Sequence, residues 1–414
     1  MNHPKMRYTY VGVDSHKDTH TAVFLDCFFE KLGEITFANL PSAFGSFLEL
    51  AQKYQVEGTV FLFGLEDISS YGRNLTVFLK NNKQEVKHVN ATLVARERKN
   101  QTITQKTDSV DAECAARVLL SKFSELPNAN AQDMYWVLRT LVTRRNSLVK
   151  HRSSAKKQLH NFVTQHYPNY RQFFDKIDGK TALNFFMHYP SPETLKGITA
   201  PELTAFLQDT GRGNYKLDDA QFILTTLEDT AIEFQEFRDA MIKSTVRQLR
   251  FISDEIAQVE ESMAVFLRKF NFTLTSMTGI DTVTAARLLA YIGDIKKFST
   301  PAKLARYAGI APVTYASGKK ELQFANERGN RKLNQLFYLL SLQVSFALGP
   351  SHKVMNSFFY DYYNRKISQG KTKHQALKCV QRRLVNIIWT MLTNNEEYVN
   401  PPSYNLPNED ETQT

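Results

Sequence analysis

Residues 7 to 90 alternate strand-like and helix-like segments in an order that restricts the fold. Five short runs are rich in β-branched and aromatic residues, and a helical stretch precedes each of the last two. The strands are expected at 8–14, 20–26, 33–39, 59–66 and 85–90, and the helices at 41–54 and 71–82. Short links make the first three strands an antiparallel meander, and strand–helix–strand crossovers make the last two parallel to the first. The sequence therefore predicts an α/β domain with helices on the faces of one sheet.

The pattern changes to long helices after about residue 130. Apolar residues at three-to-four spacing predict two long helical regions that form either an antiparallel pair or an oligomerising coiled coil. We expect an α/β domain over 1–130, long basic and amphipathic helices over 131–273 with a small insert near 175–215, a helical domain over 274–395 and a flexible tail over 396–414. The fold class is thus α/β followed by all-α.

The charge balance favours a polyanionic partner. Lysine and arginine number 52 against 42 acids, which gives a net charge of +10. Residues 134–174 contain no acid, so phosphate contacts are expected along this helix, although a solvated basic face is the alternative. Its candidate nucleic-acid-binding residues are Arg139, Arg144, Arg145, Lys150, Arg152, Lys156 and Lys157.

Cysteine content and hydropathy predict a protein of the reducing cytosol. Cys27, Cys114 and Cys379 lie far apart, so they indicate neither a disulfide framework nor a zinc site. The first residues lack the apolar run of a signal peptide, and no segment approaches the roughly 20 apolar residues of a membrane span. We expect neither export nor a membrane location.

Four carboxylates are spaced so that they could meet. Asp14 ends the first expected strand and Glu66 the fourth, and these strands are expected to be neighbours. Asp108 and Asp111, at i and i+3, would share one helix face. Such a cluster repels itself unless divalent cations neutralise it, and oxygen ligands favour Mg²⁺ or Mn²⁺. The alternative is that these acids are surface or capping residues, with Asp108 as an N-cap.

Two histidines flank the first of these acids. His16 and His20 are interpreted as residues at a strand edge, rather than as metal ligands or proton carriers.

The segments that carry these acids resemble a known family. VGVDSHKDTHTAVFLD, LEDISSYGRNL and KTDSVDAECAARVL are similar to the N-terminal RuvC-like domain of IS110-type transposases, in which an Asp-Glu-Asp-Asp tetrad binds metal. The stretch from SMTGIDTVTAARLLAYIGDI to RGNRKLNQLFY looks like the C-terminal transposase domain of that family. The resemblance implies a ribonuclease H-like fold for the first domain and covers most of residues 7–125 and 274–345.

The resemblance also implies roles for particular residues. Asp14, Glu66, Asp108 and Asp111 would be the metal-binding tetrad, and Ser317 would be the serine nucleophile. Ser317 lies in the segment VTYASGKKELQFANERGN, which is expected to be a loop between two helices. A loop serine that bonds its own backbone is the alternative for Ser317. An approaching phosphate would meet the nearby cations Lys319, Lys320, Arg328, Arg331 and Lys332.

An IS110-type transposase would cut and rejoin DNA through the serine, assisted by the magnesium-binding acids. The resemblance implies donor and target DNA as partners, a structured non-coding guide RNA from the element itself, and a dimer or tetramer with composite sites. The expected location is the bacterial cytosol, in association with the nucleoid. Alternatives are a RuvC-like metal-dependent nuclease, a site-specific DNA invertase, and a non-catalytic nucleic-acid-binding scaffold.

Overall fold

The computed structural model describes residues 3–66, 70–101, 105–129, 133–211, 215–227, 233–317, 320–324, 326, 329–348 and 353–399. Of residues 133, 314–317, 320–323, 347–348 and 353, it describes the backbone and not the side chain. The chain forms two compact units, Met1–Trp136 and Val137–Thr414.

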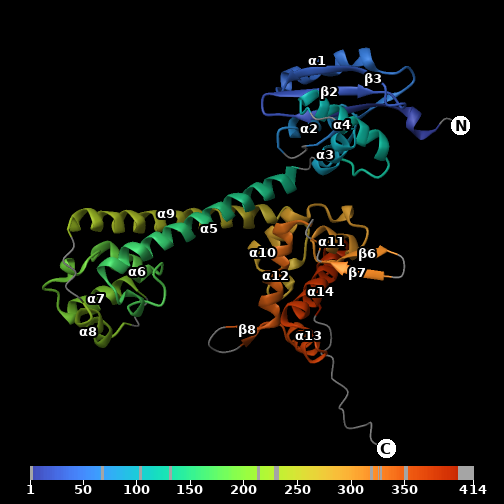
Figure 1. Cartoon of the computed structure of the whole chain (residues 1–414). Helices are drawn as coiled ribbons and strands as arrows, with labels where there is room; N and C mark the ends of the chain where they lie inside the picture. The colour runs from blue at the N-terminus through green and yellow to red at the C-terminus, as the bar shows by residue number, and fades with distance from the viewer. Residues whose placement is uncertain are drawn as a thin grey trace, which may run out of the picture. The chain divides into compact units, whose positions relative to one another are not determined.

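A five-stranded mixed sheet forms the centre of the first unit (Figure 1). Its strands are β1 (Tyr8–Ser15), β2 (Thr19–Leu25), β3 (Lys31–Ala38), β4 (Val60–Leu65) and β5 (Glu85–His88). The spatial order is β3-β2-β1-β4-β5, with β1, β2 and β3 antiparallel and with β4 parallel to both β1 and β5. The predicted α/β fold of ribonuclease H-like type is confirmed.

Helices cover both faces of this sheet. The unit's helices are the 3-10 turns η1 (Pro4–Arg7) and η2 (Gln52–Tyr54) and the α-helices α1 (Pro41–Ala51), α2 (Arg73–Asn81), α3 (Ala91–Asn100) and α4 (Asp108–Lys122). On one face, Val11 and Phe63 pack among buried residues of α1 and α2. On the other, Tyr10 and Leu62 pack among residues of α3 and α4. Because both faces are buried, β1 and β4 are apolar almost throughout.

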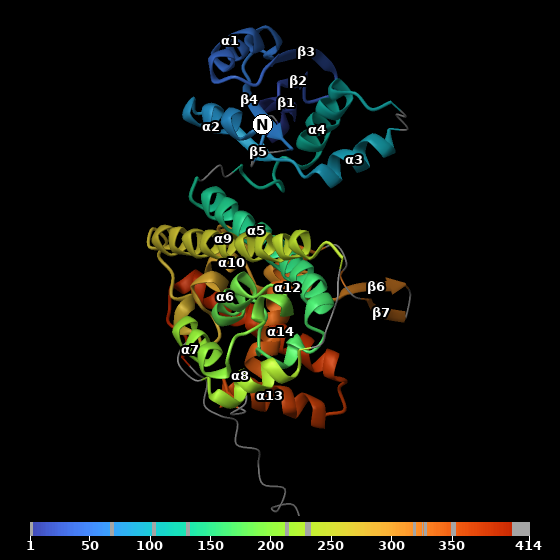
Figure 2. The ribbon, with the colours of Figure 1, turned by 90° about the vertical axis from the view of Figure 1, so that its left-hand side faces the viewer.

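Two long antiparallel helices form the frame of the second unit. These are α5 (Asp133–His166), which begins just before the unit boundary, and α9 (Gln235–Leu267), and both views show them side by side (Figures 1 and 2). Leu138 packs with Met263, and Leu148 packs with Ile252 further along the pair. The two helices are antiparallel, because the residue number of the α9 partner decreases as the residue number along α5 increases.

A small helical group connects α5 to α9. It consists of η3 (Tyr170–Gln172), α6 (Lys180–His188), η4 (Pro192–Leu195), α7 (Ala200–Thr210) and α8 (Leu217–Thr225). Its core contains Tyr167, Tyr170, Phe173 and Phe174, all at most 8% exposed. These aromatic rings are therefore core residues rather than platforms on which nucleic-acid bases stack.

The C-terminal part of the second unit is a helical bundle with short strands. Its elements are η5 (Leu274–Ser276), α10 (Thr282–Ile292), η6 (Ile295–Lys297), α11 (Pro301–Tyr307), β6 (Val313–Ser317), β7 (Lys320–Phe324), α12 (Arg331–Ser345), β8 (Ala347–Leu348), β9 (Lys353–Val354), α13 (Ser357–Ser368) and α14 (Lys373–Asn394). The sequence between α11 and α12 was expected to be a loop, and this expectation is wrong, because β6 and β7 pair as an antiparallel hairpin. The expected tail at 396–414 lies outside the described residues from position 400 onward. Among the helices that are described, none has the length and apolar character needed to span a bilayer.

Candidate active site

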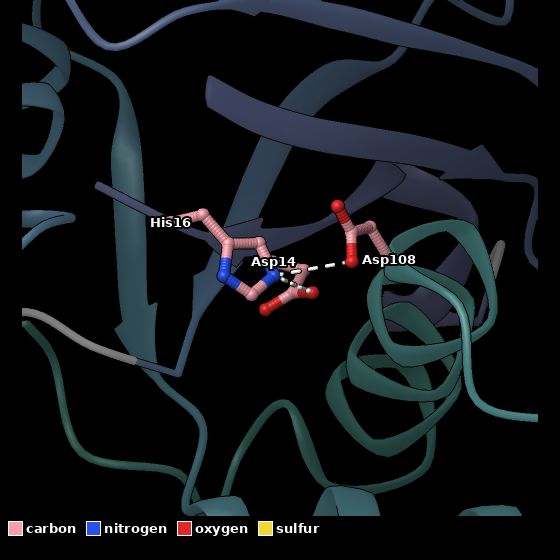
Figure 3. A group of neighbouring side chains, drawn as sticks. All are labelled: Asp14, His16 and Asp108. Atoms are coloured by element: carbon pink, nitrogen blue, oxygen red, sulfur yellow. Dashed lines mark hydrogen bonds and ion pairs between the residues drawn. The ribbon is translucent and has the colours of Figure 1, made fainter. Parts of the chain in front are cut away.

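Two aspartates and a histidine meet beside the end of β1 (Figure 3). Asp14 lies near the end of β1, His16 just after it and Asp108 at the start of α4. The Nε2 atom of His16 lies 3.1 Å from Oδ2 of Asp14 and 3.2 Å from Oδ1 of Asp108. The potential ligand atoms of the three residues all lie within 4.8 Å of one another. One cation could contact all three.

A threonine cap leaves the Asp108 carboxylate available to this group. Thr107 is the N-cap of α4, and its hydroxyl accepts a hydrogen bond of 3.2 Å from the backbone N–H of Val110. Asp108 is the first residue inside the helix and its side chain is 55% exposed. The alternative that Asp108 caps the helix is therefore wrong, and its carboxylate gains from the helix dipole without filling the cap.

Small residues place α4 directly against β1. A Cβ atom at Gly12 would lie 2.1 Å from the carbonyl oxygen of Ala112 and 2.2 Å from the backbone nitrogen of Ala116. Real Cβ atoms do not come within 3.0 Å of such atoms, so only glycine fits at position 12. This close approach brings the first turn of α4 to the strand end that carries Asp14.

Asp111 lies one helical turn beyond Asp108 and has a partner of its own. Its carboxylate forms an ion pair with the Arg98 guanidinium from α3, and the two side chains are 13% and 23% exposed. Asp108 and Asp111 therefore lie in different environments, Asp108 beside His16 and Asp111 beside Arg98.

The electrostatics of Asp14 reflect its crowded position. Burial is the largest effect and raises the pKa of the Asp14 carboxyl, whereas the neighbouring His16 lowers it. The negative charges of Asp111 and Asp108 raise the pKa further. The three aspartates are thus close enough to affect one another, and a cation at this point would favour the ionised form of Asp14.

Glu66 lies at the end of the adjacent strand. The register of β1 and β4 pairs Val13 with Leu65, so Asp14 and Glu66 each follow a paired residue on neighbouring parallel strands. Glu66 is half-buried. Of the described residues, only Asp14, His16 and Asp108 form a group with all ligand atoms within 4.8 Å, and Glu66 is outside that group.

The two histidines near Asp14 differ in environment, although both lie near the end of a strand. His16 contacts two of the acids, whereas His20 is fully buried in β2 beside Phe37 and Phe44. The signal for His16 was its spacing, because residues two apart in an extended chain point to the same side.

The residues present fit a divalent cation. Carboxylate oxygens are the ligands that Mg²⁺ and Mn²⁺ prefer, and an imidazole nitrogen is also compatible with Mn²⁺. Asp14, Asp108 and His16 would hold the ion, with Asp111 and Glu66 adjacent to them in the fold.

Ser317 is the last residue of β6, where the hairpin register pairs it with Lys320. The side chains of these two residues, and all of Lys319 and Arg328, lie outside the described residues. Arg331 and Lys332 are exposed in the first turn of α12. Arg331 also lines a cavity of about 240 Å³ with Asn326 and Asn334.

The cations of α5 fall into two groups. Arg139, Arg144, Arg145 and Lys156 bind groups of their own unit, namely the Ala290 carbonyl, Glu255, Glu260 and Asp178. Lys150 and Lys157 are exposed and Arg152 is half-buried, and the described part of the chain provides no ion-pair partner for these three. The acids missing from α5 are thus partly supplied by α9.

Two family models match the chain. A model described as a transposase, whose name contains the DEDD signature and IS110, matches residues 11–168. A second, described as the transposase IS116/IS110/IS902 family, matches residues 272–355. The first range contains the four acids and the second contains Ser317.

Curated relatives include proteins of several insertion elements. An uncharacterized 44.8 kDa protein of insertion element IS116 from Streptomyces clavuligerus is 26% identical, over 95% of this chain and 96% of its own. An uncharacterized 42 kDa protein of IS900 from Mycobacterium paratuberculosis is also 26% identical, over 71% of this chain and 73% of its own. A pilin gene-inverting protein of Moraxella lacunata is 27% identical, over 40% and 52% of the respective chains.

Proposed function

The chain belongs to the IS110 family of transposases, and from this premise we propose that it cuts and rejoins DNA with Ser317 as the nucleophile. We further propose that Asp14, Glu66, Asp108 and Asp111 form its metal-binding tetrad. The convergence of Asp14 and Asp108, together with the influence of Asp111 on Asp14, is the observation that supports the tetrad most directly.

A serine nucleophile conserves the energy of the phosphodiester bond. The Ser317 hydroxyl would attack the phosphorus, form a serine phosphodiester and release the other DNA end as a hydroxyl. A hydroxyl of the partner strand would then attack the same phosphorus, form a new DNA phosphodiester, break the serine–phosphate bond and free the serine. Because the number of phosphodiester bonds is unchanged, strand exchange would need no ATP.

The metal site would complement the charge of the DNA backbone. A divalent cation at Asp14, Asp108 and His16 would polarise a phosphate oxygen and neutralise developing charge. Arg331 and Lys332 would attract the phosphates near Ser317, and Lys150, Arg152 and Lys157 are the α5 cations best placed to contact nucleic acid. Mg²⁺ is the expected ion, with Mn²⁺ as a substitute.

The partners follow from the same proposal. Donor and target DNA would be held by a dimer or tetramer, since exchange between two DNA segments needs several active centres. An element-encoded structured RNA would supply sequence specificity by base pairing, while the protein binds backbone shape. Treating the purified protein with ribonuclease should then abolish recombination, and adding the transcript back should restore it.

Site-specific inversion is the second candidate, and the observation that favours it is the match to the Moraxella lacunata pilin gene-inverting protein. Inversion and transposition would use the same strand chemistry and differ in how the DNA segments are arranged. A plasmid that carries the element ends in inverted orientation, scored both for inversion of the segment between them and for insertion of the element at a target site, separates the two.

The decisive experiment compares Ser317→Ala with Ser262→Ala, which removes an exposed hydroxyl that bonds the Gln258 carbonyl within α9. Detergent quenching of the reaction with element-end DNA should trap a protein–DNA adduct for the wild type and Ser262→Ala. Ser317→Ala should give neither adduct nor joined product. Cleavage that is unchanged in Ser317→Ala would instead support a metal-dependent nuclease.

A non-catalytic scaffold would neither bind Mn²⁺ at the acids nor cleave DNA. If the proposed metal site is correct, the wild type should do both, and Asp14→Asn should abolish Mn²⁺ binding, measured by calorimetry, and strand cleavage while DNA binding remains. Retention of cleavage by Asp14→Asn would remove the metal site from the proposal.

A further inference from the structure

The C-terminal bundle contains a cavity of about 460 Å³ whose lining is rich in positive charge. Five of its lining residues come from α14, namely Lys378, Cys379, Arg382, Arg383 and Asn386. Tyr362 of α13 and Pro312, which immediately precedes β6, also line the cavity. None of these residues belongs to the metal site or to the cations that flank Ser317.

Helical spacing places the cations together. Lys378, Arg382 and Asn386 are four residues apart along α14, so they form one stripe on the helix, and Arg383 lies beside it. Within the described ranges, none of the three cations forms an ion pair with a carboxylate. Three positively charged side chains thus line this cavity, and no described carboxylate forms an ion pair with any of them.

Unsatisfied polar atoms point to a missing ligand. The Nη1 atom of Arg382 and the Oδ1 atom of Asn386 are buried and have no hydrogen-bond partner. Buried donors and acceptors without partners are rare because each one costs free energy. Burial also lowers the pKa of Lys378, which is the behaviour of a cation without a compensating charge. A bound anion would accept a hydrogen bond from Arg382 and compensate the charge of Lys378. The Oδ1 atom of Asn386 is an acceptor and needs a donor, such as an N–H group of a nucleobase.

The rest of the lining suits a flat apolar group. Tyr362 is only partly buried, and its ring lines the cavity together with Ile310 and Pro312. A ring next to a cluster of cations matches a nucleotide, in which a planar base is attached to a phosphate-bearing sugar. The volume lies within the range of pockets that bind small ligands.

We propose that this cavity binds one unpaired nucleotide of a DNA strand, with its phosphate held by Lys378, Arg382 and Arg383 and its base against Tyr362. A base inside a duplex cannot enter such a cavity, because it must first leave the stack. The choice of DNA over RNA rests on the proposed role of Ser317, since Pro312 lies one residue before the strand that Ser317 ends. Nucleotide binding itself does not depend on that role.

The first test measures the binding of a fluorescent 10-nucleotide DNA strand by anisotropy at several salt concentrations. Lys378→Gln is compared with Lys373→Gln, an identical change at an exposed position on the same helix but outside the cavity. Lys378→Gln and Arg382→Gln should each weaken binding about fivefold or more and reduce the salt slope by roughly 0.7, the value for one single-strand phosphate contact. Lys373→Gln should bind like the wild type.

Three outcomes of this test would overturn the proposal. The first is that both cavity variants bind like Lys373→Gln. The second is equal loss of affinity for a duplex of the same sequence. The third, tighter binding of an RNA strand of that sequence, would overturn the assignment to DNA. Melting curves verify that the variants are folded, and Ser317→Ala should bind the strand normally, which separates this proposal from that of the nucleophile.

Cys379 provides a second measurement because it lines the same cavity and is half-buried. The DNA strand should slow the alkylation of Cys379, located by mass spectrometry, and leave that of Cys27 unchanged. Thymidine monophosphate should protect Cys379 at higher concentration than the strand. Equal protection by inorganic phosphate alone would reduce the cavity to a simple anion site, and absence of protection by the strand would refute the proposal.

Discussion

Gly12→Ala should weaken the first unit and disturb its metal site through a single methyl group. The new Cβ would lie 2.1 Å from the Ala112 oxygen and 2.2 Å from the Ala116 nitrogen, whereas ordinary contact begins near 3.4 Å. Both atoms belong to the backbone of α4, so the helix would have to retreat by about 1 Å. Overpacking of this kind costs about 1–3 kcal/mol, a measurable part of the roughly 5–15 kcal/mol that stabilises a domain.

The retreat of α4 would also move its first turn away from β1. Asp108 sits at the start of α4, and its carboxylate must stay close to Asp14 and His16 for the three to share an ion. Metal–oxygen bonds are about 2.0–2.1 Å long for Mg²⁺, so a displacement of about 1 Å removes one ligand. Mn²⁺ affinity, measured by calorimetry, should therefore fall by at least tenfold.

Gly45→Ala is the matched control. Gly45 lies exposed in α1, and a Cβ atom there would meet nothing within 4 Å. Alanine is favoured over glycine inside a helix by about 0.5–1 kcal/mol, so this variant should be slightly more stable. Hydrogen exchange of β1 and α4 peptides gives the local free energies. If Gly12→Ala shows the same hydrogen exchange and the same Mn²⁺ affinity as the wild type, the close packing of α4 on β1 neither stabilises the first unit nor positions Asp108.

Three further predictions concern other parts of the chain. Leu148→Ala should cost about 2–3 kcal/mol in urea unfolding, since Leu148 fills a small cluster between α5 and α9; a cost under about 0.5 kcal/mol would contradict that packing. Burial raises the pKa of Cys114 to about 11, so alkylation at pH 8 should spare Cys114 in the folded protein and modify it after denaturation, and rapid native modification would contradict its burial. Burial lowers the pKa of His166, so the unfolded chain binds the extra proton first as pH falls below the ordinary value of about 6.5. Stability should therefore decline from pH 7 toward the lowered pKa, and thermal melting of His166→Gln, which cannot be protonated, should show a weaker decline.

The sheet was predictable because its signals are local. The runs at 8–14 and 59–66 are apolar almost throughout, as expected for strands that are covered on both faces, and the links between strands determine their direction. The position of Asp14 at a strand end followed directly. The proximity of Asp14 and Asp108 could not be predicted from local signals alone. It depends on how closely α4 approaches β1, and Gly12 permits that close approach.

Features that depend on distant partners were not predictable in the same way. The hairpin of β6 and β7 was taken for a loop because charged and glycine residues dominate its centre, although VTYAS and KELQF alternate at strand period. The basic surface of α5 was overestimated because Arg145 pairs with Glu260, 115 residues away. Only the register of the antiparallel pair brings these two together.

Arg98 and His16 change the expected relation between metal binding and folding. From the sequence alone, a cluster of carboxylates should be tolerable only with bound metal. In the fold, Arg98 neutralises Asp111, and the imidazole of His16 lies between Asp14 and Asp108. The protein's own groups therefore reduce the repulsion, and the acids can be held in place without an ion. A metal that used all four acids would have to displace Arg98 from Asp111, so the free energy of metal binding includes the cost of breaking that ion pair. Metal should accordingly be required for strand cleavage, while its removal by a chelator should leave the first unit folded.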